Sequence, residues 1–134
     1  MVKILVVEDN DVIRETLVEL IDMEDDFIVV GAAENGSSAC KLLSEGMVPD
    51  IIVTDLNMPE MDGIKLTQVV TAQYDNIKVI VLTMHDRKAF ADHAFGAGAH
   101  GFLLKNGDMN ELFSAIKIVF HGETVVGAGV ASKK

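Results

Sequence analysis

Five polar residues with chemically competent side chains directly follow short apolar runs of the chain: Glu8, Asp9, Asp55, Thr83 and Lys105. Short apolar runs without polar alternation, such as the β-branched run over residues 4–7, are typical of strands that are covered on both faces of a parallel sheet. Sheets of this type bind ligands beyond the carboxyl ends of their strands. We therefore expect three carboxylates, a hydroxyl and an ammonium group to converge on one site.

Three carboxylates that lie close together repel one another, and one would keep its proton unless a cation were present. The chain has a single cysteine, Cys40, and four scattered histidines, so a soft or borderline metal is disfavoured. Carboxylate oxygens suit Mg²⁺, which takes a few protein ligands and keeps several waters. A bound Mg²⁺ would keep Asp55 ionised as a nucleophile, and Lys105 and Thr83 would stabilise a phosphoryl group during in-line transfer.

The elements that must position these residues alternate regularly between strand and helix patterns. The predicted strands cover residues 4–7, 27–30, 51–53, 78–82 and 100–104, and the predicted helices cover residues 12–21, 37–45, 62–73, 86–95 and 108–120. Short connections and right-handed crossovers predict an α/β three-layer sandwich, in which a five-stranded parallel sheet has helices on both faces. The flavodoxin-like strand order 2-1-3-4-5 is a common solution for five such units, and we expect it here.

Composition limits the class of protein. The 134 residues suit one domain, and 21 acidic against 11 basic side chains give a net charge of −10. That balance argues against binding of nucleic acid or anionic membranes by this domain alone. A single cysteine and the lack of a secretory or membrane-spanning apolar run favour a cytoplasmic setting. We expect a domain over residues 1–122, followed by a tail or linker over residues 123–134.

The run from Asp55 to Gly63 has the pattern D-x-x-M-P-x-M-D-G, and it occurs together with Glu8-Asp9, Thr83 and Lys105. This combination resembles the receiver domain of two-component response regulators, the CheY-like family. The segments 82–86 and 98–105 are similar to the NarL/FixJ subgroup of that family. The resemblance extends over residues 2–122 and implies the same fold.

The resemblance also implies a role for each matching residue. Asp55 would accept a phosphoryl group from a sensor histidine kinase or a phosphotransfer protein. Mg²⁺ would be held by Asp9, by Asp55, by the backbone carbonyl of Asn57 and by Glu8, directly or through water. Lys105 would pair with the Asp55 carboxylate and then with its phosphate.

Switching would follow from the same site. Thr83 would move its hydroxyl to the phosphoryl oxygen, and Phe102 would follow it inward. Met84 and His85 would lie at the rim of the pocket. Phosphorylation would then bias a surface formed by the fourth helix, the fifth strand and the fifth helix, and so control an output. In the subgroup this output is usually transcriptional, through a DNA-binding domain that this sequence does not contain.

Two alternatives remain open at this stage. A small Mg²⁺-dependent phosphohydrolase could use Asp55 as its nucleophile, but the chain offers no obvious second acid/base for the leaving group. A receiver could also switch through protein contacts without phosphate. We expect a phosphoacceptor signalling domain and not an enzyme with turnover.

Three further residues carry separate expectations. Asn106 stands where many receivers have proline, so a cis bond after Lys105 is not expected. In the last predicted helix, Met109, Leu112, Phe113, Ile116, Val119 and Phe120 share one face, which we expect to be the buried one. Ile118 lies on the opposite face, and we hypothesise that it belongs to a phosphorylation-controlled contact with a second copy or a downstream domain.

Overall fold

The computed structural model describes residues 1–127, which form alternating strands and helices. In chain order the elements are β1 (Val2–Val7), α1 (Asp11–Asp22), β2 (Phe27–Ala33), α2 (Gly36–Ser44), β3 (Ile51–Thr54), α3 (Gly63–Gln73), β4 (Lys78–Thr83), α4 (Lys88–Gly96), β5 (Gly101–Leu104), α5 (Met109–Phe120) and β6 (Val125–Val126). All five predicted strands and all five predicted helices are present, and their bounds differ from the predicted ones by up to three residues.

The sheet is parallel throughout, with the strand order β2-β1-β3-β4-β5-β6. The predicted α/β class and the order of the first five strands are confirmed. The expected count of five strands was one too few, because Val125 and Val126 add a sixth strand within the segment that was interpreted as a tail. A two-residue strand has no alternation to detect, and its pairing with β5 depends on contacts distant in sequence.

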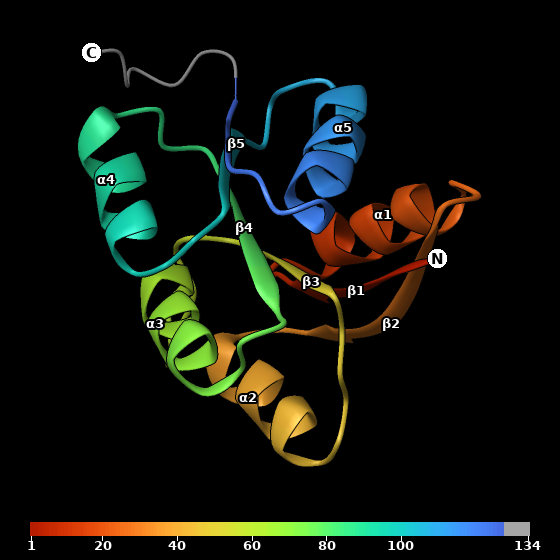
Figure 1. Ribbon diagram of the computed structural model, residues 1–134, viewed down its shortest axis with the longest axis horizontal. Helices are drawn as coiled ribbons and strands as arrows, with labels where there is room; N and C mark the ends of the chain where they lie inside the picture. The colour runs from red at the N-terminus through yellow and green to blue at the C-terminus, as the bar shows by residue number, and fades with distance from the viewer. Residues whose placement is uncertain (128–134) are drawn as a thin grey trace.

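Two apolar cores fill the spaces between the sheet and its helices. On one face α2, α3 and α4 contribute Ala39, Leu66 and Ala91, and on the other face α1 and α5 contribute Leu17 and Leu112. Figure 1 shows α1 and α5 together on one side of the sheet and the other three helices on the opposite side. Because both faces of the central strands are covered, these strands are apolar except at positions near their ends, such as Lys3, Thr54 and Lys78.

Polar side chains fix the starts of four helices. Asn10, Asn35, Asp62 and Asp108 each accept a hydrogen bond from a backbone N–H in the first turn of the following helix. Such caps satisfy N–H groups that have no partner within the helix. All four helices follow a strand and start after loops at the carboxyl edge of the sheet, so the caps also hold those loops.

The buried face of α5 differs from the prediction at its end. Leu112, Ile116 and Val119 are buried, but Phe120 is 44% exposed. Phe120 is the last residue of the helix, and its ring packs edge-on against His121 at a centroid distance of 5.7 Å. The prediction that Phe120 belongs to the core was therefore wrong.

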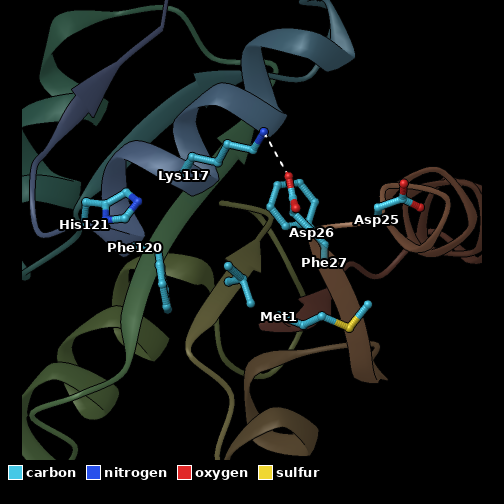
Figure 2. A pocket seen from close by; sticks show the side chains of 8 residues that line it. Met1, Asp25, Asp26, Phe27, Lys117, Phe120 and His121 are labelled. Carbon is cyan, nitrogen blue, oxygen red and sulfur yellow. Dashed lines mark ion pairs between the residues drawn. The ribbon is translucent and has the colours of Figure 1, made fainter.

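An open hollow of about 360 Å³ lies at the amino ends of β1 and β2, beside the last turn of α5. Figure 2 shows Phe120 and Met1 on its wall and the ion pair from Lys117 Nζ to Asp26 Oδ2, which measures 3.2 Å. This hollow is at the end of the sheet opposite to the polar residues that follow β1, β3, β4 and β5. Within residues 1–127, no helix is long and apolar enough to cross a membrane.

Candidate functional site

Backbone hydrogen bonds at the carboxyl edge of the sheet position the candidate residues. The pairing of β1 with β2 continues to Glu8, whose N–H donates to Ala33 O at 3.0 Å. Asp55 N–H donates to Val7 O at 2.9 Å, and Lys105 N–H donates to the carbonyl of Thr83 at 2.7 Å. Each of these residues thus continues the hydrogen-bonding pattern of its strand by one residue. The sheet therefore fixes the backbone position from which each side chain starts.

The three predicted carboxylates lie together. Glu8, Asp9 and Asp55 each offer an oxygen, and these oxygens lie within 4.8 Å of one another. Glu8 and Asp55 are buried, whereas Asp9 is exposed. Lys105 Nζ lies 2.7 Å from Glu8 Oε1 and 3.1 Å from Asp55 Oδ2. The expected convergence of acidic groups with an ammonium group is therefore present.

Burial and charge act on the ionisation of this cluster. Desolvation raises the pKa of Glu8 above its ordinary value, against the hydrogen bonds from Lys105 and from the N–H of Asn10, and the negative charge of Asp55 adds to the increase. Burial alone would lower the pKa of Lys105, but the hydrogen bond with Glu8 and the charge of Asp55 outweigh it, so this pKa is raised. Lys105 is thus held as an ammonium ion beside two carboxylates.

Arg14 fixes the loop that carries Glu8 and Asp9. Its Nη1 donates to the backbone carbonyl of Glu8 at 2.8 Å, and its Nη2 contacts Asp11 Oδ1 at 2.6 Å. The side chain is only 19% exposed. Sequence reasoning missed this residue, because an arginine within the first two turns of a helix carries no signal of a contact made backwards to a strand end.

The loop between β3 and α3 is held by close backbone contacts. Leu56 N–H donates to Asp55 Oδ1 at 2.7 Å, and Gly63 N–H donates to Leu56 O at 2.8 Å. A side chain at Gly63 would place its Cβ 2.1 Å from Asp55 O, so only glycine fits there. Glu60 has a φ of +69°, a conformation that favours glycine, and sequence reasoning did not single it out.

The loops after β3 and β4 are joined by side chains. Asn57 Nδ2 and His85 Nε2 form a short polar contact, and the His85 ring lies 4.7 Å from the Phe90 ring on α4. Thr83 is buried, and its Oγ1 accepts a hydrogen bond from His85 N–H at 3.2 Å. Met84 is 63% exposed. His85 and Met84 thus lie in the loop next to Thr83, and the contact with Phe90 was not foreseen.

Two other predicted residues lie away from the carboxylates. Phe102 is fully buried, within the core that faces α3 and α4. Ile118 is 37% exposed on α5. No peptide bond among residues 1–127 is cis, so the bond after Lys105 is trans.

These observations define a class: a doubly wound parallel α/β domain with an acidic cluster and a lysine at the carboxyl edge of its sheet. Residues 4–117 match the family model described as "Response regulator receiver domain". The match covers most of the chain, and the chain belongs to the response-regulator receiver family, a family of signalling domains.

Its relatives are of the NarL/LuxR type. The chain is 36% identical over 121 residues to the transcriptional regulatory protein DegU of Brevibacillus brevis, covering 90% of this chain and 51% of that protein. It is 31% identical over 133 residues to the response regulator GacA of Pseudomonas aeruginosa, covering 99% of this chain and 62% of that protein. The chain therefore spans about half to three fifths of the length of these curated relatives.

Solved structures agree with the fold. A LuxR-family two-component response regulator from Aurantimonas sp. SI85-9A1 superposes with a TM-score of 0.90 at 33% identity, over 96% of this chain and 91% of that one. The signal receiver domain of a putative response regulator NarL from Mycobacterium tuberculosis gives a TM-score of 0.84 at 31% identity, over 91% and 98% of the two chains. The CheY-like fold and the NarL-type subgroup expected from the motifs are thus confirmed.

Proposed function

We propose that Asp55 accepts a phosphoryl group from a phosphohistidine of a sensor kinase or a phosphotransfer protein. A carboxylate oxygen of Asp55 attacks phosphorus, the phosphorus–nitrogen bond breaks, and the imidazole leaves with the bonding electrons and takes up a proton. The observation that carries this proposal is the buried Asp55 carboxylate, 3.1 Å from the Lys105 ammonium and beside two further acids. Lys105 would hold the Asp55 carboxylate before transfer and stabilise the phosphoryl oxygens afterwards.

The acidic cluster fits Mg²⁺. Asp9 and Asp55 would coordinate the ion, with the backbone carbonyl of Asn57 as a further ligand and Glu8 acting directly or through water. Glu8 Oε1 is buried and lies 2.7 Å from Lys105 Nζ, and this contact uses one of its lone pairs, so another remains for a metal-bound water. Such oxygen ligands with room for waters are the donors that Mg²⁺ prefers. When bound, Mg²⁺ would supply positive charge for the carboxylates and the incoming phosphoryl oxygens.

The remaining predicted residues would report phosphorylation to the surface. The Thr83 hydroxyl accepts from His85 N–H and keeps its own proton, which it would donate to a phosphoryl oxygen. Phe102 is already inward, the position that we assign to the switched state. Met84 and His85 would line the rim of the pocket. The surface of α4, β5 and α5 would then control transcription through a DNA-binding domain, as the length of the relatives supports.

Intact-mass analysis after incubation with acetyl phosphate and Mg²⁺ tests the proposal. We expect one added phosphate on this chain and none on Asp55→Asn, while Asp75→Asn, in an exposed turn at the other end of the sheet, should be labelled like the parent. Rapid turnover of small phosphomonoesters would contradict the proposal, because it would indicate a phosphohydrolase. A lack of labelling with preserved Mg²⁺ binding would indicate a receiver that switches without phosphate.

We also propose that Ile118 contributes to a contact with a second copy or a following domain in the phosphorylated state. Its partial exposure on α5 supports this. Sedimentation velocity with and without beryllofluoride, a mimic of the phosphoryl group, is the measurement. Ile118→Glu should abolish the self-association that beryllofluoride induces, and Gln73→Glu, an exposed site on α3 at the other face of the sheet, is the control. Unchanged self-association and partner affinity in Ile118→Glu would contradict this role.

A further inference from the structure

The added strand β6 meets β5 at the predicted switch residue. Val125 N–H donates to His100 O at 2.9 Å, and Gly127 N–H donates to the carbonyl of Phe102 at 2.8 Å. In the register of this pair, Val126 lies opposite Phe102. The outer edge of the strand that carries Phe102 is therefore occupied by a segment of the same chain.

The side chains of β6 sort onto the two faces of the sheet as those of β5 do. Val125 is half-buried and packs against the core that contains Leu103, on the side of α5. Side chains alternate along a strand, so Val126 lies on the other face, the same face as Phe102. Val126 is 44% exposed, whereas the Phe102 ring is fully buried. Val126 thus stands between the Phe102 ring and the open edge of the sheet.

This arrangement restricts the movement of Phe102. A ring that turned outward from β5 towards the sheet edge would meet the β6 backbone and Val126. On the opposite face, towards α5, a Cβ on the buried Gly127 would lie 2.8 Å from Leu103 Cδ2 and 3.2 Å from Leu103 Cα, so the end of β6 packs closely against β5. Phe102 also has no hydroxyl that could gain a hydrogen bond in an exposed position.

We propose that β6 is a built-in strap that holds Phe102 in its inward position and thereby favours the phosphorylated state of the receiver. This inference rests on the proposed function, in which the inward ring belongs to the switched state. Docking of β6 and occupation of the Asp55 site stabilise the same arrangement. Coupling between two sites is reciprocal. If docking of β6 raises the affinity of the Asp55 site for its ligand by some factor, binding of that ligand must raise the docking equilibrium of β6 by the same factor.

A matched pair of proline variants tests the strap. Val125→Pro removes the N–H that donates to His100 O and should release β6. In a parallel ladder the N–H of the next residue points away from the neighbouring strand, so Val126→Pro should keep the pairing. We expect Val125→Pro to lower the affinity for beryllofluoride in the presence of Mg²⁺ about five-fold or more, because about five-fold is the lower end of the usual coupling between two sites. Val126→Pro should change this affinity less than about two-fold, below that range.

A measurement on the unaltered chain keeps the inference testable if Val125→Pro fails to fold. Hydrogen exchange at the amides of Val125 and Gly127 should slow when beryllofluoride and Mg²⁺ are added, with amides in the middle of α1 as the internal reference. Equal affinities for the two proline variants, or unchanged exchange in β6 when the site is saturated, would overturn the strap. Failure of the unaltered chain to bind beryllofluoride, with no label on Asp55, would instead refute the proposed function.

Discussion

At the scale of single residues, the site depends on backbone conformations that the motif only partly reveals. Glu60 has a φ of +69° between Pro59 and Met61, in the loop that follows the candidate phosphoacceptor. Its side chain is exposed, so no packing compensates for the left-handed conformation. The loop thus stores a small amount of strain within five residues of Asp55.

Replacement of Glu60 by glycine should stabilise the protein. A left-handed residue with a side chain costs roughly 1–2 kcal/mol, and the greater freedom of glycine in the unfolded chain offsets about 0.5–1 kcal/mol of the gain. We expect Glu60→Gly to raise the free energy of unfolding by about 0.5–1 kcal/mol in urea titrations. Glu60→Ala keeps the strain and removes the charge, so an equal gain in that variant would attribute the effect to charge instead.

Arg14 allows a test of geometry against charge at the proposed Mg²⁺ site. If its double contact orients the loop of Glu8 and Asp9, both Arg14→Lys and Arg14→Met should weaken Mg²⁺ binding about 10-fold, as loss of an outer support typically does. If only its positive charge matters, Arg14→Met should bind Mg²⁺ more tightly and Arg14→Lys should be unchanged. Calorimetric titration of Mg²⁺ distinguishes these outcomes, and thermal unfolding without Mg²⁺ reports any general loss of stability.

At the scale of elements, the features that follow from a repeated sequence pattern were predicted from the sequence. The features that depend on a single contact or a single backbone angle were missed. The five longer strands were predictable because each is a short apolar run, and the convergence of Glu8, Asp55 and Lys105 followed from strand ends in a parallel sheet. The backward contact of Arg14, the left-handed Glu60 and the strand β6 each depend on one tertiary contact or one dihedral angle, which no periodicity encodes. Phe120 was misplaced for a related reason, since helical spacing takes no account of where the sheet beneath α5 ends.

Gly63 couples the start of α3 to the end of β3. A Cβ there would lie 2.1 Å from the backbone carbonyl oxygen of Asp55, and neither backbone can yield without shifting the site. We expect Gly63→Ala to lower the free energy of unfolding by at least about 1–3 kcal/mol, the usual range for overpacking, and to reduce phosphorylation of Asp55. The comparison is Gly96→Ala at the end of α4, where a Cβ meets nothing within 4 Å. Equal stability of the two variants would show that the loop is more compliant than the contact implies.

At the scale of the whole molecule, the protein is strongly negative and also concentrates negative side chains at the candidate site. The chain has a net charge of −10, and three carboxylates gather at one edge of the sheet with one lysine among them. The hollow at the other end of the sheet pairs Lys117 with Asp26 instead. A divalent cation would therefore relieve repulsion at the carboxyl edge in particular. Because a small domain unfolds cooperatively, this relief would increase the free energy of unfolding of the whole domain.

Mg²⁺ should accordingly stabilise the entire domain, and the gain should increase with pH. At 100 times its Kd, Mg²⁺ would add about 2.7 kcal/mol to the free energy of unfolding. In the metal-free protein the pKa of Glu8 is raised by burial, so ionisation of Glu8 costs stability as pH rises from the unfolded value of 4.5 through the raised folded value. Bound Mg²⁺ favours the ionised carboxylate of Glu8, so a proton on Glu8 competes with the ion. As pH rises between the two pKa values, loss of this competition increases the stabilisation by Mg²⁺ by at most about 1.4 kcal/mol per pH unit.

Urea unfolding with MgCl₂, against NaCl at equal ionic strength, measures this gain at a series of pH values. Asp9→Asn should reduce it at every pH, since it removes one carboxylate of the cluster. Glu8→Gln should flatten its pH dependence, because the group that competes for the proton is gone. If the gain of the unaltered chain were as large at pH 4.5 as at pH 7, Glu8 would have no part in holding the ion, and Asp9 and Asp55 would have to hold it without the third carboxylate.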